Sequence, residues 1–460
     1  MKLFKKDYSI DASLSVDERV AYGAGNFATG FANTGMGVFM LFYFTNYVGL
    51  NAGIVGTILL VSRFLDGISD LLMGYIVDRT HSKNGKARPW ILRACVPFAV
   101  ATVLLFAVPG NHVSVAQYIW VFVTYNLLNT VLYTMCAVSY SSLTCLLTQN
   151  QYERGLLGTF GMFGLVAAQF IVNGFTLKLV HFFGDTKMSW TITFAIYAAV
   201  GLVCHLFCYK NTVERVTNVQ ADSGKKEDLS AWQSVKYLFK NKYWVMFAAM
   251  EIFVCLMAGC FYGAVTYYAT YILGNAESQA VITNSMLVTQ MIFMCLSFLF
   301  IRKFGKVGSL RIGSVIMIIG FVIDIVLGGT QTGMIIGTAV CGIGNGIAAA
   351  PIGGIGADTV EYGEWKFGVR SEGMAFAAVS TATKIGNGLA TAIIGWALVL
   401  GGFDSALTVQ SAQALTSIKV ATLWLPMIFL VIILVIALCF DLEKIYAKIM
   451  ADLKERRAKK

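Results

Sequence analysis

The chain has 460 residues, of which 57% are hydrophobic and only 13% are charged, and its formal net charge is +10. Soluble domains carry about 25% charged residues, so this composition excludes an ordinary soluble enzyme and favours a membrane protein. A positive charge is also typical of nucleic-acid binding, but here Lys and Arg collect in alternate polar loops, as cytoplasmic loops do. We therefore expect a multi-pass protein of the plasma (inner) membrane, in contact with lipid and without a nucleic-acid partner.

Apolar segments long enough to cross a bilayer, which takes about 20 residues each, recur along almost the whole chain. Twelve are predicted, and the first and fourth are long enough to tilt or bend. The predicted spans are residues 20–46, 52–78, 88–108, 116–146, 155–180, 189–209, 243–273, 280–301, 308–328, 331–357, 372–400 and 417–440. The alternation of basic loops places both termini in the cytoplasm, and the polar first 19 residues do not resemble a signal peptide.

The longest polar interruption divides the spans into six and six. It covers residues 210–242, so we expect an N-terminal bundle over 1–209, a cytoplasmic linker over 210–242, and a C-terminal bundle with a cytoplasmic tail over 243–460. The loop after the second span carries Gly74, Asp78, Arg79, Gly85, Lys86 and Arg88. This pattern resembles the major facilitator signature with a longer middle, and RKFGK after the eighth span is its counterpart. The predicted fold is all-α: twelve transmembrane helices in two six-helix bundles, the major facilitator architecture.

Two carboxylates in the second span are the strongest sign of function. Asp66 and Asp70 lie four residues apart, and so share one helix face. Carboxylates in a bilayer are costly and usually mark an ion or substrate path. We predict that they bind a coupling cation, Na⁺ or H⁺, with Thr134 of the fourth span lending a neutral oxygen. Alternatively, Arg63 simply neutralises Asp66. No cofactor is expected, and no metal beyond Na⁺ at this pair.

Two further groups of charged residues invite a functional interpretation. Lys384, in the middle of the eleventh span, is placed to pair with the aspartates or to contact a substrate hydroxyl; the alternative is that it snorkels to the membrane surface. An acidic cluster lies in the loop between the tenth and eleventh spans. A cytoplasmic gate would pair Asp358, Glu361 and their neighbour Arg370 with Arg79, Arg88 or Arg154 of the other half. A merely solvated loop is the alternative.

Two long segments resemble one family of transporters. FLDGISDLLMGYIVDRTHSKNGKARPWIL, and ADTVEYGEWKFGVRSEG followed by Lys384, are similar to the glycoside-pentoside-hexuronide:cation symporters, which include the melibiose and glucuronide carriers. The similarity runs from about Tyr22 to Phe440. It implies that Asp66 and Asp70 bind the cation, that Thr134 lies beside them, and that Lys384 lies between the cation and sugar sites.

Positions that correspond to the melibiose carrier's sugar contacts are changed, which argues against a melibiose-like galactoside. The changed positions are Thr29, Gly30, Ala137, Ser141, Met162 and Ala349. A segment around Ser141 is closer to the glucuronide carrier, and favours a glycoside or a hexuronide. The matching helix faces predict a cargo site lined by Asn26, Thr29, Ser141, Ser380, Thr383 and Lys384.

The sequence therefore predicts a monomeric cation-coupled symporter that imports a small sugar by alternating access. No hydrolytic or phosphoryl-transfer motif is visible, so an enzyme is not expected. Two alternatives remain open at this point. One is a transporter of an amphipathic, lipid-like cargo, and the other is a sensor that binds sugar without transporting it.

Overall fold

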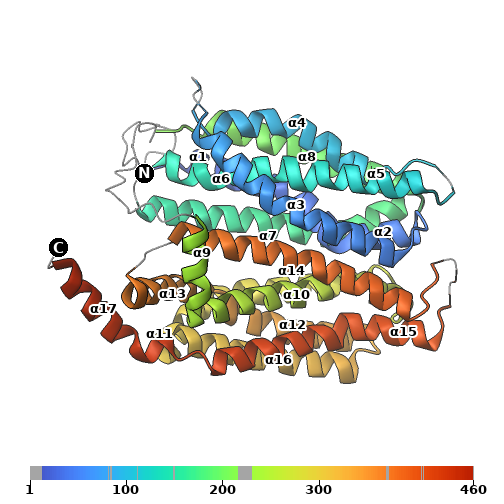
Figure 1. The fold of residues 1–460 in the computed structure, drawn as a ribbon. Helices are drawn as coiled ribbons and strands as arrows, with labels where there is room; N and C mark the ends of the chain where they lie inside the picture. Colours follow the sequence, from blue (N-terminus) through green and yellow to red (C-terminus); the bar gives the residue numbers. More distant parts are fainter. Residues whose placement is uncertain are drawn as a thin grey trace. The chain divides into compact units, whose positions relative to one another are not determined.

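The computed structural model describes residues 13–80, 82, 85–110, 112–148, 151–215, 231–368, 372–405, 407 and 409–458. Within these ranges the chain is helical and contains no strand (Figure 1). It divides into two compact units, one of Met1–Asp222 with Phe403–Val409 and the other of Ser223–Gly402 with Gln410–Lys460. The division along the chain falls within the predicted linker.

Unit 1 contains the first six predicted spans, and two of its helices change their winding midway. Its elements are α1 (Val16–Thr34), η1 (Gly35–Phe39), α2 (Met40–Asn46), α3 (Ala52–Asp78), α4 (Arg88–Leu105), α5 (Val115–Tyr125), η2 (Asn126–Tyr133), α6 (Thr134–Leu147), α7 (Gln151–Phe182) and α8 (Lys187–Asn211). The π-helical segments η1 and η2 interrupt the first and fourth spans, the two that were long enough to bend.

Unit 2 contains the other six predicted spans, with one further described helix before them and one after them. Its elements are α9 (Ala231–Lys240), α10 (Lys242–Tyr271), α11 (Ser278–Leu327), α12 (Gln331–Ala349), α13 (Ile352–Phe367), α14 (Glu372–Leu400), α15 (Ala412–Lys419), η3 (Val420–Trp424), α16 (Leu425–Leu438) and α17 (Leu442–Ala458). The prediction of a loop over the acidic cluster is wrong, because α13 continues as a helix to Phe367. That helix ends where Gly368 adopts a left-handed conformation, with φ 70°.

Ten helical stretches in the described part of the chain are long and apolar enough to cross a membrane. One of them, α11, has 50 residues and contains the eighth and ninth predicted spans. A straight helix of that length would measure about 75 Å, far more than a bilayer core of about 30 Å. The chain breaks it at Gly305, whose φ of 76° is not helical. With α3 over the second predicted span, every predicted span lies on helix.

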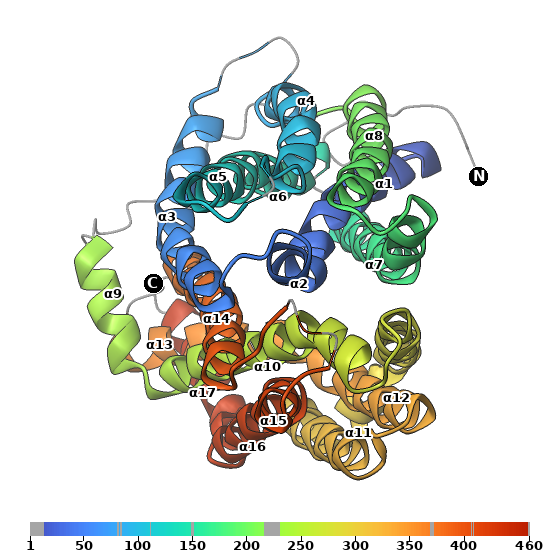
Figure 2. The ribbon, with the colours of Figure 1, turned by 90° about the vertical axis from the view of Figure 1, so that its right-hand side faces the viewer.

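Glycines let the helices of each unit approach closely. Viewed along the helices of unit 1, α1 lies beside α7 and α8 (Figure 2). A Cβ atom added to Gly164 of α7 would come within 2.2 Å of the Gly23 carbonyl oxygen of α1. In unit 2, a Cβ on Gly344 of α12 would come within 2.4 Å of the Gly313 carbonyl oxygen of α11. Such contacts hold membrane helices together through van der Waals packing, because apolar burial gives little driving force in lipid.

The same carboxylate contact appears once in each unit, and supports the predicted repeat. In unit 1, Glu214, just after α8, accepts hydrogen bonds from the backbone N–H groups that open α4. These are the N–H groups of Lys86, Ala87 and Arg88, at 2.7, 3.0 and 2.8 Å. In unit 2, Glu443 accepts from the N–H groups of Lys306 and Val307, at 2.9 and 3.3 Å. Each set of donors follows a glycine with positive φ, Gly85 or Gly305, and a carboxylate is favoured at a helix N-terminus.

Candidate cation and sugar site

Helix α3 carries the predicted cation residues about midway along its length. It begins where the Asn51 side chain accepts hydrogen bonds from the N–H groups of Gly53 and Ile54, at 3.0 and 3.2 Å. From its first residue to Asp66 it rises about 21 Å. Asp70 follows one turn later on the same face.

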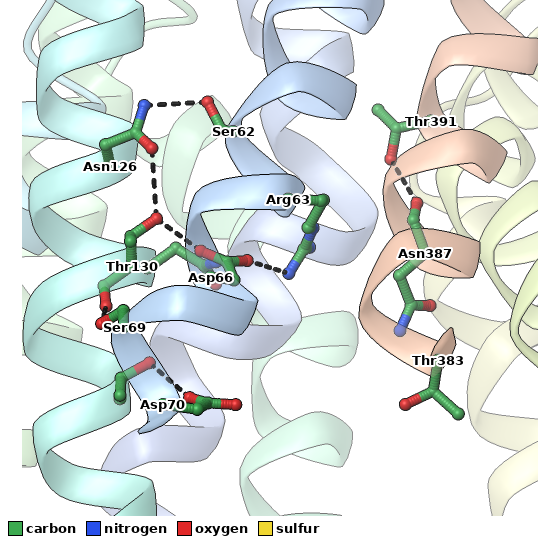
Figure 3. Close-up of polar contacts among 12 residues, drawn as sticks. Ser62, Arg63, Asp66, Ser69, Asp70, Asn126, Thr130, Thr383, Asn387 and Thr391 are labelled. Carbon is green, nitrogen blue, oxygen red and sulfur yellow. Dashed lines mark hydrogen bonds and ion pairs between the residues drawn. The ribbon is translucent and has the colours of Figure 1, made fainter. Parts of the chain in front are cut away.

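Asp66 is a fully paired, buried carboxylate. Its side chain is 1% exposed, and Oδ2 accepts from an Arg63 guanidinium nitrogen at 3.3 Å and from Asn129 Nδ2 at 2.7 Å. The Thr130 hydroxyl donates to Oδ1 (Figure 3). A buried charge needs this combination of an opposite charge and hydrogen-bond donors. The Arg63 pairing that the sequence left as an alternative is therefore present in the structure.

Two of the three donors to Asp66 come from the π-helical segment η2, which the sequence reasoning missed. Asn126, at its start, donates from Nδ2 to the Ser62 hydroxyl at 2.8 Å, and its Oδ1 lies 3.1 Å from the Thr130 hydroxyl. Ser69 of α3 donates to the Thr130 carbonyl (Figure 3). Asn126, Asn129 and Thr130 have i, i+3, i+4 spacing, a polar stripe in an otherwise apolar span that would have indicated them. Single π-type turns are frequent at functional sites.

Asp70 has different surroundings. It is partly buried, and one of its partners is the Thr134 hydroxyl, which donates at 2.9 Å from the first residue of α6. The structure thus brings the three predicted cation residues together. The described residues contain no group of three His, Cys, Asp or Glu side chains that could hold a metal ion.

The predicted cargo residues lie in both units. In unit 1, Thr29 is buried and donates to the Asn26 carbonyl at 3.0 Å, one turn earlier on α1. Ser141 is exposed on α6 and donates to the Ala137 carbonyl at 3.0 Å.

In unit 2, Ser380, Thr383 and Lys384 share one face of α14, and the Thr383 hydroxyl donates to the Ser380 carbonyl at 2.8 Å. Asn387 and Thr391 continue a polar stripe along the same helix (Figure 3).

The predicted gate residues that the structure describes have partners within their own unit. Arg79 stacks over the Tyr75 ring at 4.3 Å, and Arg88 donates to the Tyr209 carbonyl at 2.6 Å. The acidic members lie on α13: Asp358 pairs with Lys306 at 2.8 Å, and Glu361 accepts from the Tyr446 hydroxyl of α17. Arg370 and the Arg154 side chain lie outside the described residues.

The fold and this site define a class of protein, the membrane transporters of the major facilitator type. Solved transporters share the fold. The structure matches that of a D-xylose-proton symporter with a TM-score of 0.66 at 15% identity, over 92% of this chain and 96% of the other. It also matches a bacterial homolog of the human lysosomal transporter Spinster, with a TM-score of 0.69 at 13% identity, over 94% and 97%.

The family follows from the sequence comparisons. The model of the MFS/sugar transport protein family matches residues 21–444, so the chain belongs to that family. It is 31% identical to the isoprimeverose transporter of Lactiplantibacillus pentosus, over 96% of this chain and 92% of the relative. It is 26% identical to the glucuronide carrier protein homolog of Escherichia coli, over 95% of each. The resemblance to the glycoside-pentoside-hexuronide symporters is confirmed, and the protein is a membrane transporter rather than an enzyme.

Proposed function

We propose that this protein is a symporter that imports a glycoside or hexuronide together with Na⁺ or H⁺. The observation that carries the proposal is the pair of carboxylates on one face of α3, of which Asp66 is buried and ion-paired to Arg63 while Asp70 is only partly buried. Three donors contact Asp66, namely Arg63, Asn129 and Thr130, so its carboxylate oxygens already accept hydrogen bonds from the protein. Asp66 is therefore the fixed charge of the site, and Asp70, with Thr134, is the group that takes up and releases the coupling cation.

Coupling follows from linkage between the two ligands. A cation at Asp70 favours the protein state that binds sugar, and by thermodynamic reciprocity sugar favours the cation to the same extent. The two bundles then rock between outward-open and inward-open states. Each elementary charge that moves inward contributes about 2.3 kcal/mol per 100 mV of membrane potential, which drives accumulation of the sugar.

The cargo would contact polar side chains on both units. The proposed contacts are Asn26, Thr29, Ser141, Ser380, Thr383 and Lys384. Hydroxyl and amide groups can donate to and accept from the hydroxyl groups of a sugar. Lys384 would form an ion pair with a carboxylate of the cargo or donate a hydrogen bond to a ring hydroxyl. The names of the relatives, an isoprimeverose transporter and a glucuronide carrier homolog, support a glycoside or hexuronide as cargo. We place the transporter in the plasma membrane as a monomer with both termini in the cytoplasm.

The cytoplasmic gate is part of this proposal. Asp358 would exchange Lys306 for Arg79 or Arg88 of unit 1 when the inward mouth closes. Cysteines introduced at Arg79 and Asp358 in a cysteine-free background should form a disulfide that stops transport and is reversed by reductant. If the disulfide forms and transport continues, the proposed gate is wrong.

Vesicle uptake tests the proposed function. Vesicles contain the wild type, Asp70→Asn or Asp185→Asn. Under an imposed Na⁺ or H⁺ gradient, we measure their uptake of labelled isoprimeverose, glucuronides and related glycosides. Asp185 is an exposed acid whose φ of 54° asparagine tolerates, so its variant is the matched control. Accumulation should follow one gradient, collapse in Asp70→Asn and persist in Asp185→Asn. Undiminished accumulation in Asp70→Asn would overturn the assignment.

A further inference from the structure

Unit 2 contains a buried acid that the proposed coupling does not use. Asp324 lies in the last turn of α11, and its side chain is 0% exposed. Among the residues that the structure describes, neither of its carboxyl oxygens has a hydrogen-bond partner. Asp66 is almost as deeply buried, but three donors contact it. Asp324 therefore needs a different explanation for its burial.

A glycine of the neighbouring helix packs against this carboxyl group. A Cβ atom on Gly337 of α12 would lie 2.1 Å from Oδ1 of Asp324 and 2.8 Å from the Gly320 carbonyl oxygen. Glycine at this position leaves the space that the carboxyl group fills. A backbone position without a side chain offers the carboxyl group no hydrogen-bond donor, and an ionised carboxylate needs donors.

The helices packed around Asp324 bring no positive charge to it. Tyr268 of α10 and Cys341 of α12 are the titratable groups that face it, and each donates its own proton to a backbone carbonyl, at 3.0 and 3.4 Å. The sequences of α12, η3 and α16 contain no charged residue. On α10, the charged residue nearest in sequence to Tyr268 is Glu251, about 25 Å away along the helix. The charged groups of α13 and α17 meet α11 at Lys306, about 27 Å from Asp324.

The place of Asp324 on its helix also opposes a negative charge. The last turn of a helix is the negative end of its dipole, where an anion is unfavourable. An unpaired carboxylate without water costs so much that such groups bind a proton instead. Burial, the lack of a hydrogen-bond partner and the helix end therefore all favour the neutral, protonated acid.

We propose that Asp324 is a proton-binding site in unit 2, separate from the carboxylate pair of α3. It holds its proton at neutral pH while α10, α11 and α12 stay packed around it. Water that enters between these helices ionises the acid, so alkaline medium weakens this packing. The site makes unit 2 sensitive to pH whichever cation is coupled at Asp70.

Infrared spectroscopy of the reconstituted transporter tests the proposal, because a protonated carboxyl group has its own carbonyl stretching band. The variant is Asp324→Asn, which keeps the shape of the neutral acid. The matched control is Asp441→Asn, at an exposed acid whose pKa the Lys444 ammonium, 2.8 Å away, holds below its usual value. At neutral pH the acid band should be absent from Asp324→Asn and unchanged in Asp441→Asn. An identical acid band in the wild type and Asp324→Asn would overturn the proposal.

A second measurement needs no variant. Wild-type protein grown with carboxyl-labelled ¹³C-aspartate should show at neutral pH an acid band shifted by the isotope. The absence of this shifted band would contradict the proposal even where Asp324→Asn folds poorly.

The unfolding temperature provides a third test. Native protein binds a proton at Asp324 that unfolded protein releases, so stability falls as pH rises above the ordinary range of aspartate. Asp324→Asn should show a shallower fall, and an equal fall in both proteins would contradict the assignment.

Discussion

Replacement of Arg63 by glutamine tests whether Asp66 is the fixed charge of the site. The change leaves a carboxylate that is 1% exposed with only the neutral donors of η2. Removal of one partner of a buried ion pair costs about 3–5 kcal/mol. Arg63 itself is 19% exposed, and two donors to Asp66 remain, so we expect a loss near the lower end, about 3 kcal/mol. Asp66→Asn in the Arg63→Gln background removes the buried carboxylate that has lost its ion-pair partner, and should restore most of the lost stability.

The assay is a double-mutant cycle on the free energy of unfolding in detergent micelles, with wild type, Arg63→Gln, Asp66→Asn and the double variant. Arg19→Gln is the matched control, because Arg19 is 18% exposed and pairs at 2.8 Å with a Glu153 that is 4% exposed. It should destabilise unit 1 without changing the cation dependence of transport. If the effects of Arg63→Gln and Asp66→Asn on the free energy of unfolding add to within about 0.5 kcal/mol, the reasoning is refuted, because the effects of mutations at residues in contact are not additive.

Three further predictions follow from contacts in the structure. Thr134→Ala removes one hydrogen bond to Asp70, worth about 0.5–1.5 kcal/mol, and should weaken the apparent cation affinity about 2- to 13-fold in transport assays; Thr134→Ser, which keeps the hydroxyl, should not. Glu214→Ala loses three bonds to backbone N–H groups and should lower the free energy of unfolding by about 2 kcal/mol. Glu443→Ala, at an exposed site with two such bonds, should cost less, and equal losses would contradict this. Gly85→Ala places a Cβ 2.3 Å from the Glu214 carboxyl group at a φ of 102° and should destabilise by about 1–2 kcal/mol; a neutral effect in the same unfolding assay would show that the loop relaxes.

The sequence predicted what depends on local pattern. Apolar length alone located the helices, and the i, i+4 spacing located Asp66 and Asp70 on one face of α3. The repeated loop residues indicated two related halves, but not the glutamate contacts that the structure shows beside Gly85 and Gly305.

What depends on the register between helices was not predictable. Asn129 and Thr130 reach Asp66 because η2 packs against α3 in one register, and more than 60 residues separate them from it in the chain. The burial of Asp324 depends in the same way on a glycine of the next helix, Gly337. The helical α13 was missed because its acidic residues are typical of a loop.

Sugar binding with and without cation tests the central claim most directly. Binding of the transported sugar to purified wild type and Asp70→Asn is measured by calorimetry across a range of the coupling cation, and cation binding is measured across a range of sugar. In the wild type each ligand should raise the affinity of the other by the same factor, about 5- to 150-fold. Asp70→Asn should bind sugar with an affinity that no longer depends on the cation. A full cation effect in Asp70→Asn would contradict the account, because the coupling would then reside elsewhere.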